Sequence, residues 1–315
     1  MKAVFMGTPE FALASLEVVA RQCDLKAVYS QPDKPRGRGN KITPPPVKAR
    51  ALELGIPVLQ PLKLRDEAVL AELKAFEPEV IVVVAYAKLI PKTILDLPRH
   101  GCINVHPSLL PRHRGAIPIQ ASIMAGDRET GVWTFFMDEG YDTGDLILCR
   151  RTEIGPEETG EELSARMAAL GAEVLSETLT ALASGTAPRL VQPAEGANYS
   201  KVLKKEDLWV DWTRPAAEVS NFVRALAHEP GATTAFKANQ LKLGRASLTN
   251  GSGPPGSVLG VEKGQGPVVA CGEGAVLIRQ LKPPGKGWMD AWAYLQGNPF
   301  TPGDLFESRP VPAAT

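Results

Sequence analysis

The stretch Val80-Ile-Val-Val-Val-Ala-Tyr86 is a continuous apolar run made mostly of β-branched residues. Such a run is typical of a strand that is buried on both faces of a parallel sheet. Residues 67–76 precede it with helical spacing, and the short apolar runs at residues 2–6 and 25–29 enclose another helical segment. Strands that alternate with helices in this way predict an α/β fold with a mostly parallel, Rossmann-like sheet covered on both faces.

The first strand is followed at once by the turn Gly7-Thr8-Pro9-Glu10. Thr8 is suited to a helix N-cap and Pro9 to the first helical position, so we expect a helix to start here. Dinucleotide-binding folds carry their phosphate fingerprint at this point, but the pattern GxGxxG is absent. The turn therefore argues against a nicotinamide enzyme.

The pattern changes after Gly131. Residues 132–137 and 146–150 have the character of a strand pair on either side of a glycine-bounded loop. Thr159-Gly-Glu-Glu162 has the form of a capping box, which predicts the start of a helix. The apolar face of this helix continues to about Gly185, where we expect it to end.

The C-terminal third has a different organisation. Residues 186–207 contain several prolines and glycines with little periodicity, which is typical of a linker. A helix with apolar residues up to Leu226 is then followed by five short strand-like segments, which predict a smaller, C-terminal OB-like β-barrel. These segments are residues 233–236, 241–248, 257–261, 268–271 and 276–281. We therefore expect an α/β domain over residues 1–185, a linker over residues 186–207 and a barrel domain over residues 208–315.

Composition sets limits on the class of protein. The 315 residues include 35 basic and 35 acidic side chains, so any basic surface must be local. No apolar run approaches the ~18 residues of a membrane span, and no secretory signal is visible, so we expect a cytoplasmic protein. The four cysteines lack the spacing of metal ligands, and we expect no tightly bound metal.

The stretch Gly101-Cys-Ile-Asn-Val-His-Pro-Ser-Leu-Leu-Pro-Arg-His-Arg-Gly115 carries the chemistry. Asn104 and His106 lie two apart at the end of a short strand, so their side chains share one face. Further along, Asp142 lies on a glycine-bounded loop. An amide and an imidazolium can stabilise the oxyanion of a tetrahedral intermediate, and a carboxylate can orient the imidazole or help to remove a proton. These three groups suit direct acyl transfer to an amine.

Each of these side chains also has a structural alternative. His106 alone could cap a strand, and Asp142 alone could close a turn. The ordered set Asn-x-His-x-Ser-Leu-Leu-Pro, followed by Asp-x-Gly-x-Asp-x-Gly-Asp, is much harder to explain by chance. The combination therefore points to a catalytic site.

The same residues resemble the signature of the 10-formyltetrahydrofolate-dependent formyltransferases, although Pro107 stands where a small residue such as glycine is expected. The resemblance implies that Asn104, His106 and Asp142 are the catalytic trio. It also implies that 10-formyltetrahydrofolate is the co-substrate and that folate contacts come from two loops. The folate-contacting residues that it implies are Tyr86, Leu89, Ser108, Leu109, Leu110 and Pro111.

Other stretches, such as residues 5–11 and 83–86, resemble the members of this family whose amine substrate is methionyl initiator tRNA. This resemblance implies attack of the methionyl α-amine on the formyl carbon through a tetrahedral intermediate, for translation initiation. It runs over nearly the whole chain, although residues 227–231 depart from the aromatic, proline-rich run expected there. The partners would be tRNA and folate, and we expect a monomer.

Residues 31–50 contain six basic side chains against one acid, Asp33, which gives a local charge of +5. The prolines and glycines predict an exposed loop without a helix across it. It could be a plain solvated insertion, or an arm that contacts nucleic-acid phosphates. The resemblance implies that the loop enters the acceptor end of the tRNA, with Arg36, Arg38 and Lys41 as contacts.

Three alternatives stay open at this point. A formyltransferase for a small amine, such as glycinamide ribonucleotide or an amino sugar-nucleotide, would share the trio without needing the basic loop or the barrel. A formyltetrahydrofolate hydrolase would use water in place of the amine. A non-catalytic RNA-binding protein would not need an intact trio.

Overall fold

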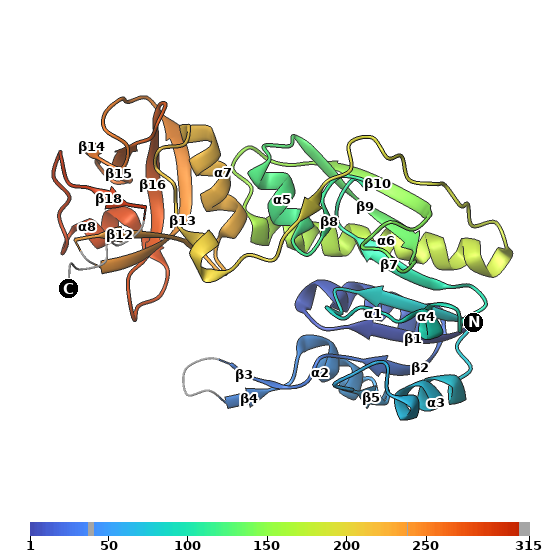
Figure 1. The fold of residues 1–315 in the computed structure, drawn as a ribbon. Helices are drawn as coiled ribbons and strands as arrows, with labels where there is room; N and C mark the ends of the chain where they lie inside the picture. Colours follow the sequence, from blue (N-terminus) through green and yellow to red (C-terminus); the bar gives the residue numbers. More distant parts are fainter. Residues whose placement is uncertain (37–40, 238, 309–315) are drawn as a thin grey trace. The chain divides into compact units, whose positions relative to one another are not determined.

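The structure is a computed structural model that describes residues 1–36, 41–237 and 239–308, without the side chains of Arg36 and Lys41. The chain forms two compact units (Figure 1). Within the described ranges, no helix is long and apolar enough to cross a membrane. Unit 1 comprises Met1–Pro118, Glu129–Thr152 and Ser164–Ser200, and unit 2 comprises Ile119–Arg128, Glu153–Leu163 and Lys201–Thr315.

Unit 1 is built around a seven-stranded sheet in the order β10-β9-β7-β6-β1-β2-β5. Strands β7, β6, β1, β2 and β5 run parallel, whereas β9 is antiparallel to β7. The predicted α/β fold with a mostly parallel sheet is therefore confirmed. The bounds are β1 Lys2–Gly7, β2 Asp24–Tyr29, β5 Val58–Leu59, β6 Val80–Val84, β7 Cys102–His106, β9 Glu129–Phe136 and β10 Leu146–Glu153.

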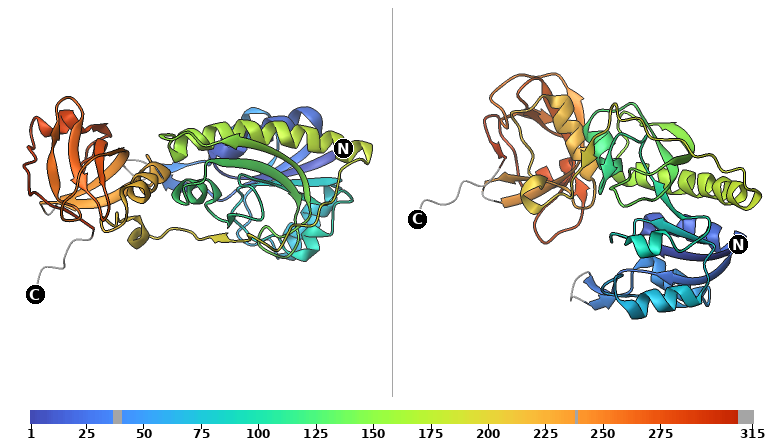
Figure 2. Two further views of the ribbon diagram at one scale, coloured as in Figure 1. Left: turned by 90° about the horizontal axis from the view of Figure 1, so that it is seen from above. Right: turned by 45° about the vertical axis from the view of Figure 1, so that its right-hand side comes forward.

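Helices cover both faces of this sheet (Figure 2). On one face, α1 contacts β1 and β2, and Gly171 of α6 lies against the Val105 side chain of β7. On the other face, Leu73 of α3 and Ile94 of α4 belong to one buried cluster with Met6 and Tyr29. Both sides of the strands are thus apolar, which explains the continuous apolar runs. The helices are α1 Leu13–Gln22, α2 Pro46–Glu53, α3 Glu67–Ala75, α4 Lys92–Leu95, α5 Pro118–Met124 and α6 Gly160–Ser184.

The start of the first helix differs from the prediction. A 3-10 turn over Glu10–Ala12 begins after Pro9 without a side-chain cap, and α1 starts only at Leu13. The Thr8 hydroxyl instead accepts a hydrogen bond at 3.3 Å from the backbone N–H of Gln31, beyond the end of β2. Thr8 is therefore not the N-cap, because a partner distant in sequence uses its oxygen.

The segment at residues 31–50 is also more ordered than a plain loop. Strands β3 (Lys34–Arg36) and β4 (Lys41–Thr43) form an antiparallel pair, and α2 begins at Pro46. The expectation that proline excludes a helix here is wrong, because the first helical position needs no N–H donor.

Helix α6 begins and ends as predicted. The Thr159 N–H donates to Glu162 Oε2 at 2.9 Å, and the Glu162 N–H donates back to Thr159 Oγ1 at 3.2 Å. This reciprocal pair is the predicted capping box. At the other end, Gly185 has a φ of +70°, the left-handed conformation that commonly follows a helix.

Unit 2 contains a curled antiparallel sheet in the order β14-β15-β16-β13-β12-β18, with β17 paired to β16. A bridge between Ser257 and Leu305 joins the β14 end to the β18 end, so the sheet closes on itself. The predicted small β-barrel is therefore confirmed. Its elements are α7 Ala216–Leu226, β12 Ala232–Phe236, β13 Asn239–Thr249, β14 Val258–Glu262, β15 Gly266–Ala270, β16 Ala275–Lys282, β17 Met289–Asp290, α8 Ala291–Leu295 and β18 Phe306–Glu307.

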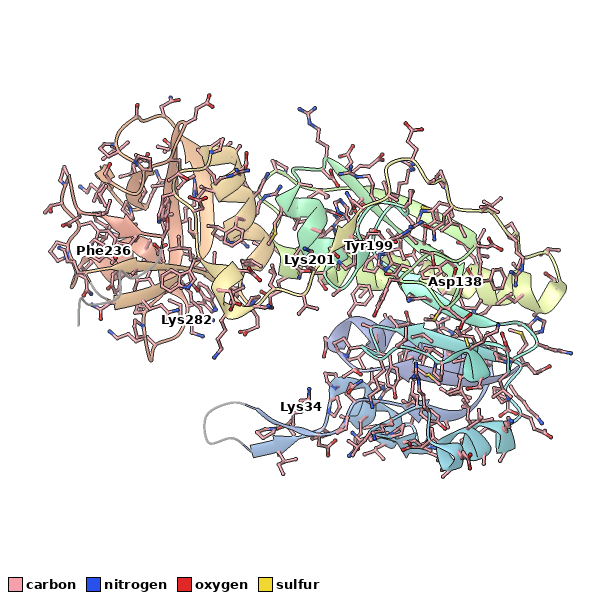
Figure 3. All side chains as sticks on the ribbon, in the orientation of Figure 1. Lys34, Asp138, Tyr199, Lys201, Phe236 and Lys282 are labelled. Carbon is pink, nitrogen blue, oxygen red and sulfur yellow. The ribbon has the colours of Figure 1, made fainter. Side chains whose placement is uncertain are left out.

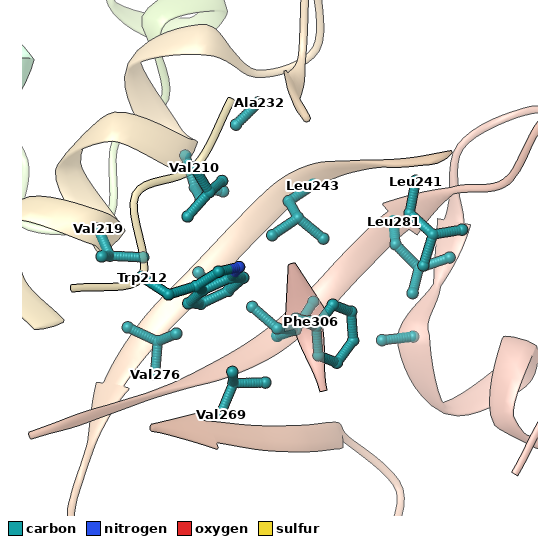
Figure 4. Packing of buried hydrophobic residues seen from close by; sticks show 14 of the residues in the cluster. Val210, Trp212, Val219, Ala232, Leu241, Leu243, Val269, Val276, Leu281 and Phe306 are labelled. Carbon is teal, nitrogen blue, oxygen red and sulfur yellow. The ribbon is translucent and has the colours of Figure 1, made fainter. Parts of the chain in front are cut away.

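The interior of the barrel is filled by apolar side chains around Trp212 (Figure 4). The Trp212 ring lies 5.8 Å from that of Phe306, and only 1% of this tryptophan is exposed. Its indole N–H donates to Thr234 Oγ1 at 3.1 Å, which satisfies the one polar atom of the side chain. The small domain therefore has a complete core of its own.

Candidate active site

Strand β7 carries Asn104 and His106 on the same face of the unit 1 sheet. Asn104 is paired with Val83 of β6 and with Phe135 of β9, and His106 is the last residue of the strand. Val105, which lies between them, faces α6 on the opposite side. The period of two along the strand therefore brings the amide and the imidazole together, as predicted.

The imidazole of His106 is only 4% exposed and is held from two directions. Its Nε2 lies 3.0 Å from the backbone oxygen of His113, and the edge of the ring meets Phe135. A carbonyl oxygen only accepts hydrogen bonds, so Nε2 is the donor here. The other nitrogen, Nδ1, lies 3.6 Å from Asp142 Oδ2. Each ring nitrogen thus faces an oxygen atom, a backbone carbonyl on one side and a carboxylate on the other.

Asp142 reaches His106 from the loop between β9 and β10. The loop leaves the sheet beside the start of β7, where the Met137 N–H donates to the Cys102 oxygen at 2.8 Å. Asp138, labelled in Figure 3, shapes it by accepting from the Thr143 hydroxyl at 2.7 Å. The chain then returns toward the end of β7.

The conformation of Asp142 itself is unusual. Its φ of +56° lies in the left-handed region, which is disfavoured for residues other than glycine. The backbone N–H of Gly115 donates to Asp142 Oδ2 at 2.7 Å, and this is the same oxygen that faces His106. A fixed N–H and an imidazole therefore converge on one carboxylate oxygen.

Gln192 is a buried site residue that the sequence did not single out. Its amide nitrogen donates to the backbone oxygens of Asp142 at 2.9 Å and Gly144 at 2.8 Å. Its amide oxygen accepts from the guanidinium of Arg114 at 2.7 Å. These bonds join positions far apart in the sequence, so no local pattern signals them.

The loop after His106 is anchored internally. The Ser108 hydroxyl donates to the Arg112 oxygen at 2.7 Å and is fully buried. Leu110 is buried in a small cluster with Phe135. Leu109 and Pro111 keep partial exposure. Of the four loop residues predicted to contact folate, these two are thus the more accessible.

The second loop predicted to contact folate follows β6. Tyr86 lies between Ala85 and Ala87, which both have positive φ values, at 48° and 61°. The Tyr86 ring is buried, its hydroxyl has no hydrogen-bond partner among the described residues, and burial raises the pKa of this phenol to about 12. Leu89, by contrast, is 53% exposed. The loop therefore turns one predicted residue inward and the other outward.

Two of the three predicted tRNA contacts, Arg36 and Lys41, lie opposite each other on the β3–β4 pair. Arg38 lies outside the described residues. Lys34, labelled in Figure 3, is exposed on the same pair.

Two of the six basic residues of this segment are already paired with acids. Lys48 binds Asp33 at 2.8 Å, and Arg50 binds Glu17 at 2.5 Å and Glu53 at 2.8 Å. The other four basic residues of the segment lie between positions 34 and 41 of the sequence. The count of +5 already subtracts Asp33 but leaves out Glu17 and Glu53, so it overstates the field of the whole segment.

The arrangement suits acyl transfer that depends on hydrogen bonding and proton transfer. No side-chain hydrogen bond of Asn104 is recorded within the described part of the chain, so its amide is available to a ligand. The described residues also contain no group of three or more His, Cys, Asp or Glu side chains placed to hold a metal ion.

Comparison with known proteins covers both units. The family model described as "Formyl transferase" matches residues 1–179, and "Formyl transferase, C-terminal domain" matches residues 202–299. A methionyl-tRNA formyltransferase from Myxococcus xanthus is 48% identical over 302 residues, which covers 96% of each chain. Another from Symbiobacterium thermophilum is 46% identical over 316 residues, covering 99% of this chain and 97% of its own.

Solved structures share the fold at lower identity. An N-formyltransferase from Helicobacter canadensis, in complex with folinic acid and dTDP-3-aminofucose, has a TM-score of 0.63 at 17% identity, covering 88% of this chain and 98% of its own. The methionyl-tRNA formyltransferase from Clostridium thermocellum has a TM-score of 0.56 at 19% identity, covering 80% of this chain and 95% of its own. Taken with the matches in sequence, which extend over nearly the full length, this chain belongs to the formyltransferase family, in the group of methionyl-tRNA formyltransferases.

Proposed function

We propose that the protein transfers the formyl group of 10-formyltetrahydrofolate to the α-amino group of methionyl initiator tRNA. The observation that carries this proposal is the convergence of His106 and Asp142, beside a free Asn104 amide, in a chain with full-length similarity to methionyl-tRNA formyltransferases. The enzyme would supply formylated initiator tRNA for translation. We expect it to act in the cytoplasm as a monomer.

In the proposed mechanism, the methionyl amine attacks the formyl carbon directly. A new C–N bond forms to the methionyl nitrogen, the bond to N10 of the folate breaks, and one proton passes from the amine to N10. Asn104 donates a hydrogen bond to the oxyanion, and the positive charge of protonated His106 stabilises the negative charge that develops on it. Asp142 orients His106 and assists removal of the amine proton.

The residues present are suited to folate. The co-substrate supplies an activated formyl carbon and a flat ring system that needs apolar cover. Leu89 is 53% exposed and Tyr141, beside the catalytic aspartate, is 68% exposed. Uncovered apolar side chains of this size are suited to contact a ring. Leu109 and Pro111 would complete the contacts, while the Tyr86 hydroxyl is a buried polar group still able to bond.

The tRNA would be bound by the β3–β4 pair and by the barrel. Lys34, Arg36, Arg38 and Lys41 on or next to this pair would contact phosphates, which carry most of the affinity of proteins for nucleic acids. We assign formyl transfer to residues 1–185 and tRNA binding to residues 208–315, with residues 186–207 between them. A formyltransferase for a small amine or a formyltetrahydrofolate hydrolase is not favoured, because the matching relatives act on methionyl-tRNA.

The test is formyl transfer from 10-formyltetrahydrofolate to methionine charged on initiator tRNA. Free methionine and glycinamide ribonucleotide serve as competing acceptors, and release of free formate measures hydrolysis. We expect transfer to the charged tRNA alone. Transfer only to a small amine, or formate release without an acceptor, would refute the proposed substrate while leaving the catalytic trio in place.

A further inference from the structure

The loop that carries Asp142 is held by a side chain from a distant segment. Gln192 is only 9% exposed, and its two amide N–H groups are directed to the backbone oxygens of Asp142 and Gly144, at 2.9 and 2.8 Å. One of these carbonyl groups belongs to Asp142 itself, which has a left-handed φ of +56°, and the other belongs to the residue two positions after it. Gln192 therefore fixes the backbone at Asp142 and at Gly144.

Gln192 is itself fixed by a buried cation. Arg114, also 9% exposed, donates to Gln192 Oε1 from Nη2 at 2.7 Å and from Nε at 3.2 Å. A guanidinium fork that holds one acceptor with two donors defines the direction of the amide. The next residue along, Gly115, donates its N–H to the Asp142 carboxylate at 2.7 Å. Arg114 thus holds the backbone of Asp142 through Gln192, and Gly115 holds the carboxylate of Asp142 directly.

The segment around Gln192 does not need this side chain for its own attachment. Leu190 and Leu146 exchange two backbone hydrogen bonds, at 2.8 and 2.9 Å. Further along, Tyr199 and Ser200 form β11, which pairs with β8 at Arg114 and Gly115. Since the backbone is anchored on both sides, the Gln192 side chain acts on the Asp142 loop rather than on its own segment.

We propose that Gln192 is a positioning residue that, anchored by Arg114, holds Asp142 in the conformation that directs its carboxylate at His106. The inference rests on the proposed function. It assigns Gln192 no contact with either substrate. Its loss should therefore slow the reaction without weakening the binding of folate or tRNA.

The key variant is Gln192→Glu. Glutamate keeps the size of the side chain and can still accept from Arg114, but it places a carboxylate oxygen against the carbonyl groups of Asp142 and Gly144. Gln192→Met removes both sets of bonds at similar volume. Val191→Ala changes the neighbouring side chain, which is 83% exposed, and is the matched control.

The measurement is steady-state formyl transfer to charged initiator tRNA, with KM for both substrates, a pH profile and thermal unfolding of each variant. For Gln192→Glu we expect kcat to fall about 10- to 100-fold, since small misplacements of catalytic groups have effects of this size. We expect both KM values to stay within about threefold of those of the parent. The acidic limb of the pH profile should be displaced, and the variant should unfold at the same temperature as the parent. Val191→Ala should match the parent.

A double-mutant cycle shows whether Gln192 acts through Asp142. In an Asp142→Asn background, Gln192→Glu should change kcat by less than about threefold. An equal loss in both backgrounds, a parent-like kcat in Gln192→Glu, or failure of both Gln192 variants to fold would each overturn the inference. A parent enzyme that does not formylate the charged tRNA would instead refute the proposed function.

Discussion

Gly144 allows the close approach of the Asp142 loop to β9, and its replacement by alanine is the most direct test of the loop geometry. A Cβ atom at this position would lie 1.7 Å from the backbone oxygen of Phe136, whereas ordinary contacts begin at 3.4 Å. The backbone would have to move by about 1.7 Å to relieve the overlap. The carbonyl of Gly144 accepts from Gln192, so this shift would also disturb the bond that holds the Asp142 loop.

A displacement of about 1 Å in a reacting group can cost roughly 10²-fold in rate. We therefore expect Gly144→Ala to lower kcat for formyl transfer by at least about 100-fold, with smaller changes in KM for tRNA and folate. The assay is single-turnover transfer to charged initiator tRNA, with circular dichroism to verify folding. Gly297→Ala is the control, because an added Cβ there meets nothing within 4 Å. A folded Gly144→Ala enzyme within about threefold of the parent rate would refute this account of the loop.

Three further predictions concern the oxyanion donor, the barrel core and the capping box. Asn104→Ala should lower kcat by about 10²- to 10³-fold in the same assay, because the proposed oxyanion donor is lost; an unchanged kcat would contradict this role. Trp212→Ala should lower the free energy of unfolding of the barrel by about 3–5 kcal/mol, measured in denaturant, because it empties a core position. The Thr159 N–H, assisted by Arg245, lowers the pKa of Glu162 from 4.5 to about 2. Ionised Glu162 therefore stabilises the folded state fully above about pH 4.5, and this stabilisation is lost as the pH falls toward 2. Because the Glu162 side chain is 49% exposed, we expect a contribution of about 1 kcal/mol, measured as the difference in free energy of unfolding between the parent and Glu162→Gln.

The main elements of both units follow from local patterns in the sequence. Continuous apolar runs predicted β1, β2 and β6, because strands with helices on both faces are buried on both sides. The Thr159–Glu162 capping box predicted the start of α6, because its two hydrogen bonds join residues three apart in the chain. Signals of this kind are contained in a few neighbouring residues, so they can be read without knowledge of the fold.

The features that the sequence did not predict depend on partners far along the chain. Thr8 has the composition of an N-cap, but Gln31 takes its hydroxyl oxygen. Lys48 is paired with Asp33, the one acid that the local charge count already includes. Arg50 is likewise paired with Glu17 of another helix. Competition of this kind appears only when the chain has folded.

The same distinction applies to the active site. Spacing alone placed Asn104 and His106 on one face of β7, because side chains alternate along a strand. The approach of Asp142 to His106 depends on a loop that crosses back from the far end of β9. Strand spacing cannot predict this approach, and it was suggested by the chemistry of the three groups, the ordered motif and the resemblance to a known family. Gln192 has no local signal, since its bonds to Asp142 and Gly144 are made from a remote segment.

The ends of the two sheets have a consequence for how separate copies of the chain behave in solution. Unpaired strand edges are templates on which other chains add and aggregate. In the unit 1 sheet, the end strand β5 has only two residues, and Leu190 covers the start of the opposite end strand by pairing with Leu146. In the barrel, the bridge between Ser257 and Leu305 joins the two ends. Edge-to-edge aggregation is thereby discouraged by the backbone itself.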